Sequence, residues 1–488
     1  MANLESNEIS EQQTADLKRK KLLKFFYPFV EFSQLLGYQL GSYTSFFMTN
    51  VYLLSVTFTA SLNLVTSAVS FVVVPLFAGF IDRFQFKKSK IWPWLVIGGT
   101  TISVVAVLIM SLPALGFRDA SALAPLVFAL LLIQQLANPI RDVPMSGVFP
   151  RLSSDPKERQ YFAMSQKVGR DAGKTIGGYI IPGMIIAMTA LSGSEMGGYM
   201  YVSVISNAVG LFGYIAFAVF GLRGSYVERE ALAEGIKAKK AKVPISAVLK
   251  AIVTNRPILA MFLFMVLHKA YFFLYSSYAT YVFTYVYGDF SMLSYFFPIF
   301  SFSAIVGVLA GPLWSRIFKD SKRSFSAAMT AHVIILAVIA VFFSSLSVGV
   351  FLILFGISSF FMGMLENWIL PGFAAASDYG AWKAGVRMDN LTMSIYSLSF
   401  TVTFAIPPVI GAIVLNSINY TEFVASGLPP TPEIVSAIGL LFSWIPLIIG
   451  TLALAVLIFV YNLNDKKLRA IQDDLASGKT KADSELKI

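Results

Sequence analysis

Long apolar segments, each near the length needed to cross a lipid bilayer, recur along the whole chain. A membrane-spanning helix needs about 20 mostly apolar residues, and about twelve segments meet that condition. They lie near residues 25–50, 52–81, 93–113, 121–148, 162–190, 197–221, 257–287, 290–315, 325–345, 347–376, 390–416 and 433–461. Only 13% of the 488 residues are charged, whereas soluble proteins have about 25%. The sequence therefore predicts an all-α membrane protein with many spans.

Basic residues gather in the connections between these segments, and on one side only. The clusters read DLKRKKLLK, DRFQFKKSK, RLSSDPKER, REALAEGIKAKKAK, RIFKDSKR and NDKKLR. Each stands at a terminus or after an even-numbered segment, and Arg118 is the exception on the opposite side. Because basic residues mark cytoplasmic loops, both termini are predicted to be cytoplasmic. The net charge of +11 thus indicates a bilayer of the cytoplasmic membrane, and not nucleic acid, as the partner.

Several functional classes are excluded by what the sequence lacks. With no cysteine, the chain has no disulfide, metal thiolate or catalytic thiol. Two histidines, His268 and His332, are too few for a histidine metal cluster. There is no nucleotide-binding motif, no catalytic constellation and no soluble output domain, so we expect neither an enzyme nor a cofactor. The polar N-terminus and the long first apolar segment do not resemble a cleavable signal peptide.

The apolar segments fall into two groups of six. A charged stretch, residues 223–255, separates an N-terminal bundle (25–222) from a C-terminal bundle (256–462), with cytoplasmic tails at 1–24 and 463–488. The connection AGFIDRFQFKK in the first group has a faint echo, AGPLWSRIFKD, in the second. Coincidence between two cytoplasmic loops is the alternative. Two similar halves joined centrally are what a major facilitator fold would show.

Charged and polar residues also occur within the apolar segments. The ionisable ones are Glu31, Arg141, Asp142, Lys167, Arg170, Asp171, Lys174, His268, Lys269 and Glu366. Such residues are costly in a membrane and usually face a cavity or a partner. The first segment adds Gln34 on the face of Glu31, and the eleventh, LTMSIYSLSFTVTF, is rich in hydroxyls. Neutral hydrogen-bonding groups beside aromatic rings are suited to a sugar.

The fifth segment carries two stripes with different chemistry. The charged stripe is formed by Lys167, Arg170, Asp171 and Lys174, whose spacing places them on one helical face. The small stripe is formed by Gly169, Gly173 and Gly177, and small residues at that spacing allow another helix to approach closely. A solvated helix end is the alternative for the charged stripe. Lys174 argues against it, because it lies roughly 20 Å along the helix from Tyr161.

The fourth segment holds Arg141 and Asp142 side by side, roughly 12 Å inside its cytoplasmic end. As neighbours on a helix they point in different directions and need not pair with each other. Lys167 and Arg170 of the fifth segment lie at a similar depth. We therefore predict that Asp142 bridges to one of them, as a gate or coupling site. A static strut between the helices is the alternative.

Several stretches resemble one transporter family. SDYGAWKAGVRMDNLTMSIYSLS, at the eleventh segment, is similar to a signature of the glycoside–pentoside–hexuronide:cation symporters. FFMTNV, AGFIDRFQFKKSKIWPWLVIG, IRDVPMSGVFPRLSSDPKERQ and NRPILAMFLF resemble other stretches of that family, in the same order. The resemblance covers nearly the whole chain. It implies a major facilitator fold and sugar uptake driven by Na⁺, Li⁺ or H⁺.

The resemblance carries over only part of the family's chemistry. Asp142 falls on a carboxylate of the cation site, and Lys167 on a basic position linked to sugar binding. The second segment has Ser70 and Val74 where carboxylates of the cation site are expected. The family's sugar-binding carboxylate, an eleventh-segment lysine and a tenth-segment aromatic are replaced, respectively, by Gln34, Thr401 and Glu366. A Na⁺ site would lack negative charge, whereas H⁺ needs a single acid, for which Asp142, Asp171 and Glu366 are the candidates.

These points together predict a secondary transporter of a sugar or glycoside that works as a monomer by alternating access, coupled to H⁺ more readily than to Na⁺. The predicted substrate-binding residues, which would line a central cavity, are Gln34, Lys167, Glu366 and Thr401. The predicted coupling residues are Asp142, Ser70 and Asp171, and the predicted gating or ion-pair residues are Arg141, Arg170 and Lys174. An uncoupled facilitator, or an exporter of another small solute, is the alternative.

Overall fold

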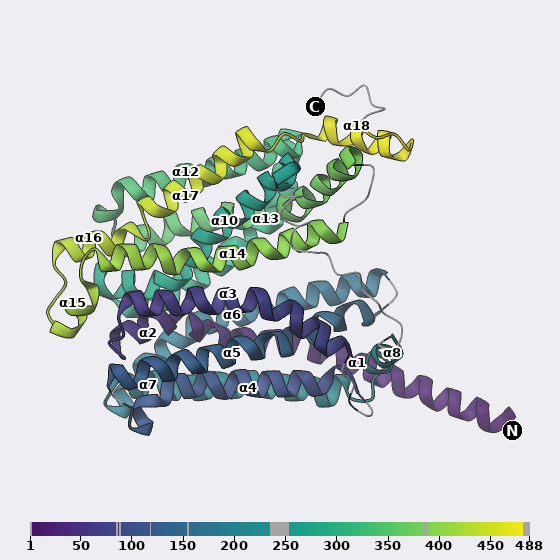
Figure 1. Cartoon of the computed structure of the whole chain (residues 1–488), viewed down its shortest axis with the longest axis horizontal. Helices are drawn as coiled ribbons and strands as arrows, with labels where there is room; N and C mark the ends of the chain where they lie inside the picture. Colours follow the sequence, from purple (N-terminus) through teal and green to yellow (C-terminus); the bar gives the residue numbers. More distant parts are fainter. Residues whose placement is uncertain are drawn as a thin grey trace. The chain divides into compact units, whose positions relative to one another are not determined.

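The computed structural model of the chain describes residues 2–83, 86, 89–117, 119–153, 156–234, 253–384 and 389–481. Within these residues the regular structure is helical, and a single isolated β-bridge joins Phe86 to Ser89. Figure 1 shows the long helices of each part of the chain running side by side. The predicted all-α class is confirmed.

The chain divides into two compact units, Met1–Lys240 and Ala241–Ile488. Unit 1 contains α1 (Ala2–Leu40), α2 (Thr44–Asn50), α3 (Val56–Arg83), α4 (Trp92–Ser111), α5 (Ala120–Val148), α6 (Pro156–Ser192), α7 (Glu195–Ala216) and α8 (Tyr226–Glu234). Unit 2 contains α10 (Arg256–Tyr281), α11 (Leu293–Phe318), α12 (Ser321–Phe342), α13 (Val348–Ala384), α14 (Asp389–Asn416), α15 (Tyr420–Ser426), α16 (Pro432–Leu440), α17 (Trp444–Ala455) and α18 (Asp465–Ala476). Each unit has a hydrophobic core of its own.

Within the described residues, ten helices are long and apolar enough to cross a membrane. They coincide with the ten predicted segments that follow residue 90. The two earlier segments are helical as well: α1 continues through a tight turn at Gly41–Tyr43 into α2, and α3 follows from Val56. The total of twelve spans and the cytoplasmic position of both termini stay predictions.

The predicted linker at 223–255 begins with α8, and its residues 235–252 lie outside the described part of the chain. The buried carboxylate of Glu228 on α8 accepts hydrogen bonds from the backbone N–H groups of Lys90 and Ile91, the latter at 2.8 Å. These groups precede the first turn of α4, where a helix has free N–H donors. Glu228 therefore fastens α8 to the start of α4.

The glycine stripe of α6 packs against α1, as the sequence predicts for a close helix contact. A Cβ atom placed on Gly169 would collide with the carbonyl oxygen of Pro28, and one on Gly173 with that of Phe32. Only glycine allows the two backbones to lie this close. The prediction that this stripe receives another helix is confirmed, and that helix is α1.

Outside the predicted spans, Glu158 at the start of α6 adds a polar link to α1. It forms ion pairs with Lys20 and Lys24, the second at 3.2 Å, and accepts a hydrogen bond from Ser153 at 2.8 Å. The hydrogen bond from Lys20, followed by that from Ser153, lowers the pKa of Glu158 to about 2. The carboxylate therefore remains charged at neutral pH, and the pairs with α1 persist.

Close contacts at glycine also occur in unit 2, between α11 and α13. A Cβ atom on Gly307 of α11 would collide with the carbonyl oxygen of Phe360, and one on Gly363 of α13 with that of Ala304. On its other side α13 packs against α10, whose buried residues form much of the core of unit 2. This arrangement brings the middle of α13 next to the middle of α10.

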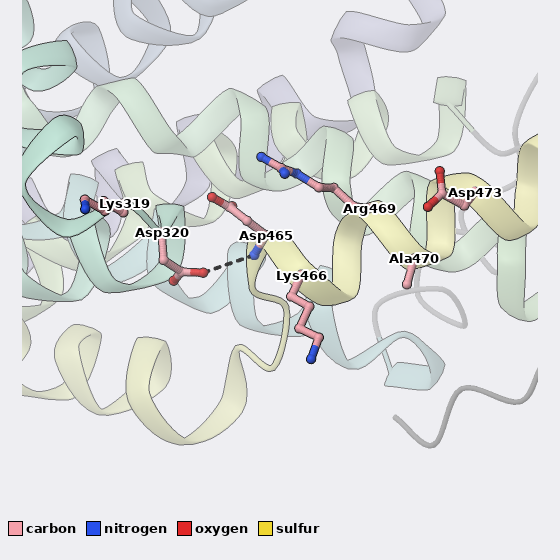
Figure 2. Close-up of a pocket in the computed structure, with 7 residues that line it drawn as sticks. All are labelled: Lys319, Asp320, Asp465, Lys466, Arg469, Ala470 and Asp473. Atoms are coloured by element: carbon pink, nitrogen blue, oxygen red, sulfur yellow. Dashed lines mark hydrogen bonds between the residues drawn. The ribbon is translucent and has the colours of Figure 1, made fainter.

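The amphipathic helix α18 covers one end of unit 2. Trp382, in the last turn of α13, is fully buried and donates to Asp474 of α18 at 3.0 Å. A surface pocket beside α18 has a volume of about 420 Å³. Figure 2 shows the residues that line it: Lys319, Asp320, Asp465, Lys466, Arg469, Ala470 and Asp473. Asp320 accepts from the backbone N–H of Asp465 at 3.2 Å. Charges of both signs line this pocket, and two of its acids, Asp320 and Asp465, accept hydrogen bonds from backbone N–H groups at the starts of α12 and α18.

Replacing Gly173 with alanine should destabilise unit 1, because the added Cβ forces α6 away from α1. Overpacking of a tight contact costs about 1–3 kcal/mol, so we expect a lower thermal unfolding temperature for the purified variant. Gly183→Ala, in the same helix but with open space around the added atom, is the matched control and should be neutral or slightly stabilising. Equal unfolding temperatures for the two variants would contradict the packing.

Candidate functional site

Within the part of the chain that the structure describes, ionisable side chains of the apolar segments form ion pairs at three places, two in unit 1 and one in unit 2. Each place contains a charged group that is nearly buried. A charge in apolar surroundings is tolerated when an opposite charge or a set of hydrogen bonds compensates it. These three places are therefore the candidates for the functional chemistry of the protein.

The first place joins α1 to α6 through Glu31, whose side chain is 3% exposed. One carboxylate oxygen accepts from Gln166 Nε2 at 2.7 Å, and the other accepts from Arg170 Nη2 at 3.1 Å. Arg170 itself is half exposed. Because both oxygens of Glu31 are engaged, this pair holds the two helices together next to the glycine stripe.

The second place lies on α5. Arg141 Nε donates to Asp142 Oδ1 at 2.7 Å, and Arg141 Nη1 donates to the hydroxyl of Tyr214 on α7 at 3.1 Å. The side chain of Arg141 is 14% exposed and that of Asp142 is 56% exposed. The expectation that these neighbours need not pair was wrong. Their Cβ atoms diverge, but the long arginine side chain turns back to reach the adjacent carboxylate.

The predicted bridge from Asp142 to the fifth segment is also corrected. Arg170 binds Glu31 instead, and Lys167 is exposed and forms no ion pair within the described part of the chain. The reason is the packing: α5 lies chiefly along α3 and α4, whereas α6 lies along α1 and α7. Although α5 and α6 follow each other in the sequence, the ion pair of Arg170 on α6 is made with Glu31 on α1.

The other predicted residues of unit 1 lie on three helices, α1, α3 and α6. Asp171 and Lys174 are half buried on α6. Gln34 is half buried on α1, and its side chain makes no hydrogen bond to the described residues. Ser70 belongs to α3, but its side chain lies outside what the structure describes. The coupling, gating and substrate roles of these residues stay predictions.

The third place joins α10 to α13 in unit 2. Glu366 of α13 accepts hydrogen bonds at a single oxygen, Oε1, from Lys269 Nζ and from His268 Nε2, the latter at 2.9 Å. His268 is 1% exposed, Lys269 13% and Glu366 37%. The second oxygen of Glu366 has no partner among the described residues. A carboxylate with one oxygen held and one free can accept a further hydrogen bond or a proton.

Aromatic rings surround this group. His268 stacks on Phe264, with ring centroids 5.5 Å apart, and its Nδ1 is 2.5 Å from the hydroxyl of Tyr271. Lys269 Nζ lies 5.6 Å from the ring of Phe272 and 6.0 Å from that of Phe400 on α14. The lysine ammonium is thus compensated both by the carboxylate and by ring faces.

Of the residues predicted to bind substrate, unit 2 contributes Glu366 and Thr401. Thr401 is half buried on α14 and directly follows Phe400. Sequence reasoning noted His268 and Lys269 as ions within a span but did not join them to Glu366. The sequence did contain a chemical indication of this pairing. Adjacent basic residues in one apolar segment need an acid from another segment, and Glu366 is an acid in the tenth segment. The sequence does not say which helices touch.

The comparisons with known proteins decide the family. A family model described as MFS/sugar transport protein matches residues 33–465, most of the chain. The chain belongs to this family. It is 23% identical over 461 residues to the uncharacterized symporter YjmB of Bacillus subtilis, covering 93% of this chain and 94% of that protein. It is 23% identical over 453 residues to the isoprimeverose transporter of Lactiplantibacillus pentosus, covering 92% and 90%.

The fold agrees with this assignment. The crystal structure of a mutant of the nucleoside transporter NupG superposes with a TM-score of 0.61 at 13% identity, covering 91% of this chain and all of that one, 100%. At this identity the likeness shows the fold alone. The predicted major facilitator fold is confirmed, and the chain is a multi-pass membrane transporter and not an enzyme.

The Glu31–Arg170 pair should respond asymmetrically to mutation. Arg170→Ala leaves a buried carboxylate with Gln166 alone, whereas Glu31→Gln leaves an arginine that water can reach. We expect Arg170→Ala to lower stability more than Glu31→Gln, by at least about 1 kcal/mol, in thermal unfolding of the purified protein. Adding Glu31→Gln to Arg170→Ala should restore part of the loss. A double variant less stable than Arg170→Ala would contradict this account.

Proposed function

We propose that the protein is a secondary active transporter that carries a sugar or glycoside across the cytoplasmic membrane by alternating access, as a monomer, with coupling to H⁺ rather than Na⁺. Membership in the MFS/sugar transport family supports the substrate class. So do the names of its relatives, which include an isoprimeverose transporter. Ions within the apolar segments support transport, because such ions usually face a hydrated path.

The observation that carries the proposal is the polar pair in unit 2 that aromatic rings border. Glu366 offers a free carboxylate oxygen to the hydroxyl groups of a sugar, and the ammonium of Lys269 can donate to their oxygens. The rings of Phe272 and Phe400, close to Lys269, offer faces on which the C–H side of a sugar ring can lie. Small-molecule sites typically combine mostly apolar walls with a few placed polar groups. In the proposal, Thr401 adds a further hydrogen bond in unit 2, and Gln34 and Lys167 are the substrate-binding residues of unit 1.

The identity of the coupling ion follows from how much negative charge is present at the positions of the expected cation site. The second segment has Ser70 and Val74 at the positions where the resemblance predicts carboxylates. Asp142 remains, but its charge is offset by Arg141 at 2.7 Å. A cation that must lose its water needs several oxygen ligands with surplus negative charge, and these positions do not supply it. A proton needs one acid, so H⁺ is the coupling ion that these residues favour.

Right-side-out membrane vesicles containing the protein test this function, with radiolabelled lactose, raffinose and isoprimeverose as probes. We expect an inward H⁺ gradient to drive accumulation of at least one probe, and a protonophore to abolish it. A Na⁺ gradient at constant pH should have no effect. Vesicles without the protein are the control.

The other outcomes separate the alternatives. Accumulation that follows the Na⁺ gradient would overturn H⁺ coupling. Equilibration of a probe without accumulation would show an uncoupled facilitator. Absence of transport for all three probes, extended to a wider glycoside panel, would remove the sugar substrate class.

A further inference from the structure

We propose that Glu366, together with His268 and Lys269, is the site that binds the coupling proton. The inference rests on the proposed transport function and places its coupling step wholly in unit 2. It differs from the expectation that Asp142 of unit 1 carries the coupling.

The other carboxylates of the apolar segments are less suited to take up a proton reversibly. Both oxygens of Glu31 are engaged, and the group is 3% exposed. Asp142 is 56% exposed, and when it is protonated Arg141 keeps its hydrogen bond to the Tyr214 hydroxyl, so Arg141 still has a partner within the protein. Asp171 forms no ion pair in the described part of the chain, so its protonation would release no partner.

Glu366 combines a reachable oxygen with partners that respond to its charge. Its Oε1 is held by His268 and Lys269, whereas Oε2 has no described partner and the side chain is 37% exposed. A proton from water can therefore form an O–H bond at Oε2 while Oε1 stays in place. Release is the reverse step: the O–H bond breaks, the electron pair stays on the carboxylate, and the proton returns to water.

Two hydrogen bonds hold the imidazole of His268 in place. Nε2 lies 2.9 Å from Glu366 Oε1, and Nδ1 lies 2.5 Å from the hydroxyl of Tyr271. His332 on α12 lies with its ring 5.2 Å from that of Tyr271. Its Nδ1–H donates to the carbonyl of Ser358 at 3.0 Å, and its buried Nε2 has no hydrogen-bond partner among the described residues.

The titratable groups that face Glu366 come from two helices. His268, Lys269 and Tyr271 belong to α10, and Tyr396 belongs to α14. His332 on α12 stands behind them, next to Tyr271. The packed helices α11 and α18 bring no interacting charge to Glu366 among the described residues. Lys269 is thus the charged group whose electrostatic surroundings change most when the carboxylate of Glu366 is protonated.

Protonation of Glu366 links the binding of the coupling proton to the binding of sugar, through Lys269. With Glu366 ionised, the ammonium and the carboxylate neutralise each other. With Glu366 protonated, Lys269 is 13% exposed and without a counter-ion, which is unfavourable in apolar surroundings. Sugar hydroxyl oxygens beside Phe272 and Phe400 would then supply its missing acceptors. The linkage is reciprocal: the proton raises the affinity for sugar, and sugar raises the affinity for the proton.

The first experiment needs no substrate. Infrared difference spectra of the purified full-length protein between acidic and alkaline pH should show a titrating carboxyl C=O band that is lost in Glu366→Gln. The matched control is Glu422→Gln, which removes an acid from the short helix α15 and should keep that band. Because Glu366→Gln strands Lys269, the double variant Glu366→Gln/Lys269→Gln removes the acid without leaving the charge, and it should also lack the band.

The second experiment uses whichever of lactose, raffinose or isoprimeverose the wild type accumulates in vesicles. Glu366→Gln, which mimics the protonated state, should lose H⁺-driven accumulation of that sugar against a gradient. Its sugar affinity should no longer rise as the pH falls, whereas that of Glu422→Gln should follow the wild type.

Two results would overturn the inference: an unchanged titrating band in both Glu366 variants, or H⁺-driven accumulation that persists in Glu366→Gln. These results differ from failure of the proposed function, in which the wild type itself transports no sugar. The infrared result stands even then, because it reports proton binding without a substrate.

Discussion

An ionised side chain in an apolar helical bundle must find a compensating group, and the structure of this protein depends on how that need is met. In each of the three ion pairs that the structure describes within the apolar segments, at least one partner is nearly buried. Two of them join helices far apart in the sequence: Glu31 and Arg170 are separated by 139 residues, and Lys269 and Glu366 by 97. Compensation of charge thus selects which helices can be neighbours, in addition to holding them together.

Close backbone contacts make these pairs geometrically possible. The glycines of α6 let α1 approach until Arg170 can reach the buried Glu31, and the reciprocal glycines Gly307 and Gly363 bind α11 to α13 in unit 2. Without the hydrophobic effect to drive association in lipid, such packing and the polar contacts beside it are the main attractive terms between helices. The same helix, α6, therefore serves two purposes with two stripes: one stripe sets the distance, and the other supplies charge.

The match between this chain and its relatives extends over the scaffold. Identity to the named relatives is 23%, and to the superposed nucleoside transporter 13%, although the matches cover nearly the full chain. Packing residues can vary as long as volume and pattern persist, whereas substrate and ion specificity depend on single side chains. The replacement of expected carboxylates by Ser70 and Val74, and the presence of Glu366 beside His268 and Lys269, are changes of the second kind. In the proposed function these differences change the chemistry of transport, while the fold is kept.

The sequence by itself determined the environment, the positions of the helices and the existence of a close contact along α6, because apolar length and residue spacing are local properties. It also identified the ionisable residues that form the described ion pairs within the apolar segments. Only the tertiary structure decided how those ions pair. Spacing shows which residues share a helical face, but it does not show which helix covers that face. Asp142 was therefore predicted to bridge to Lys167 or Arg170, whereas Arg170 binds Glu31. Nor does spacing show how far a long side chain bends, which is why the Arg141–Asp142 pair and the group around Glu366 became visible only in three dimensions.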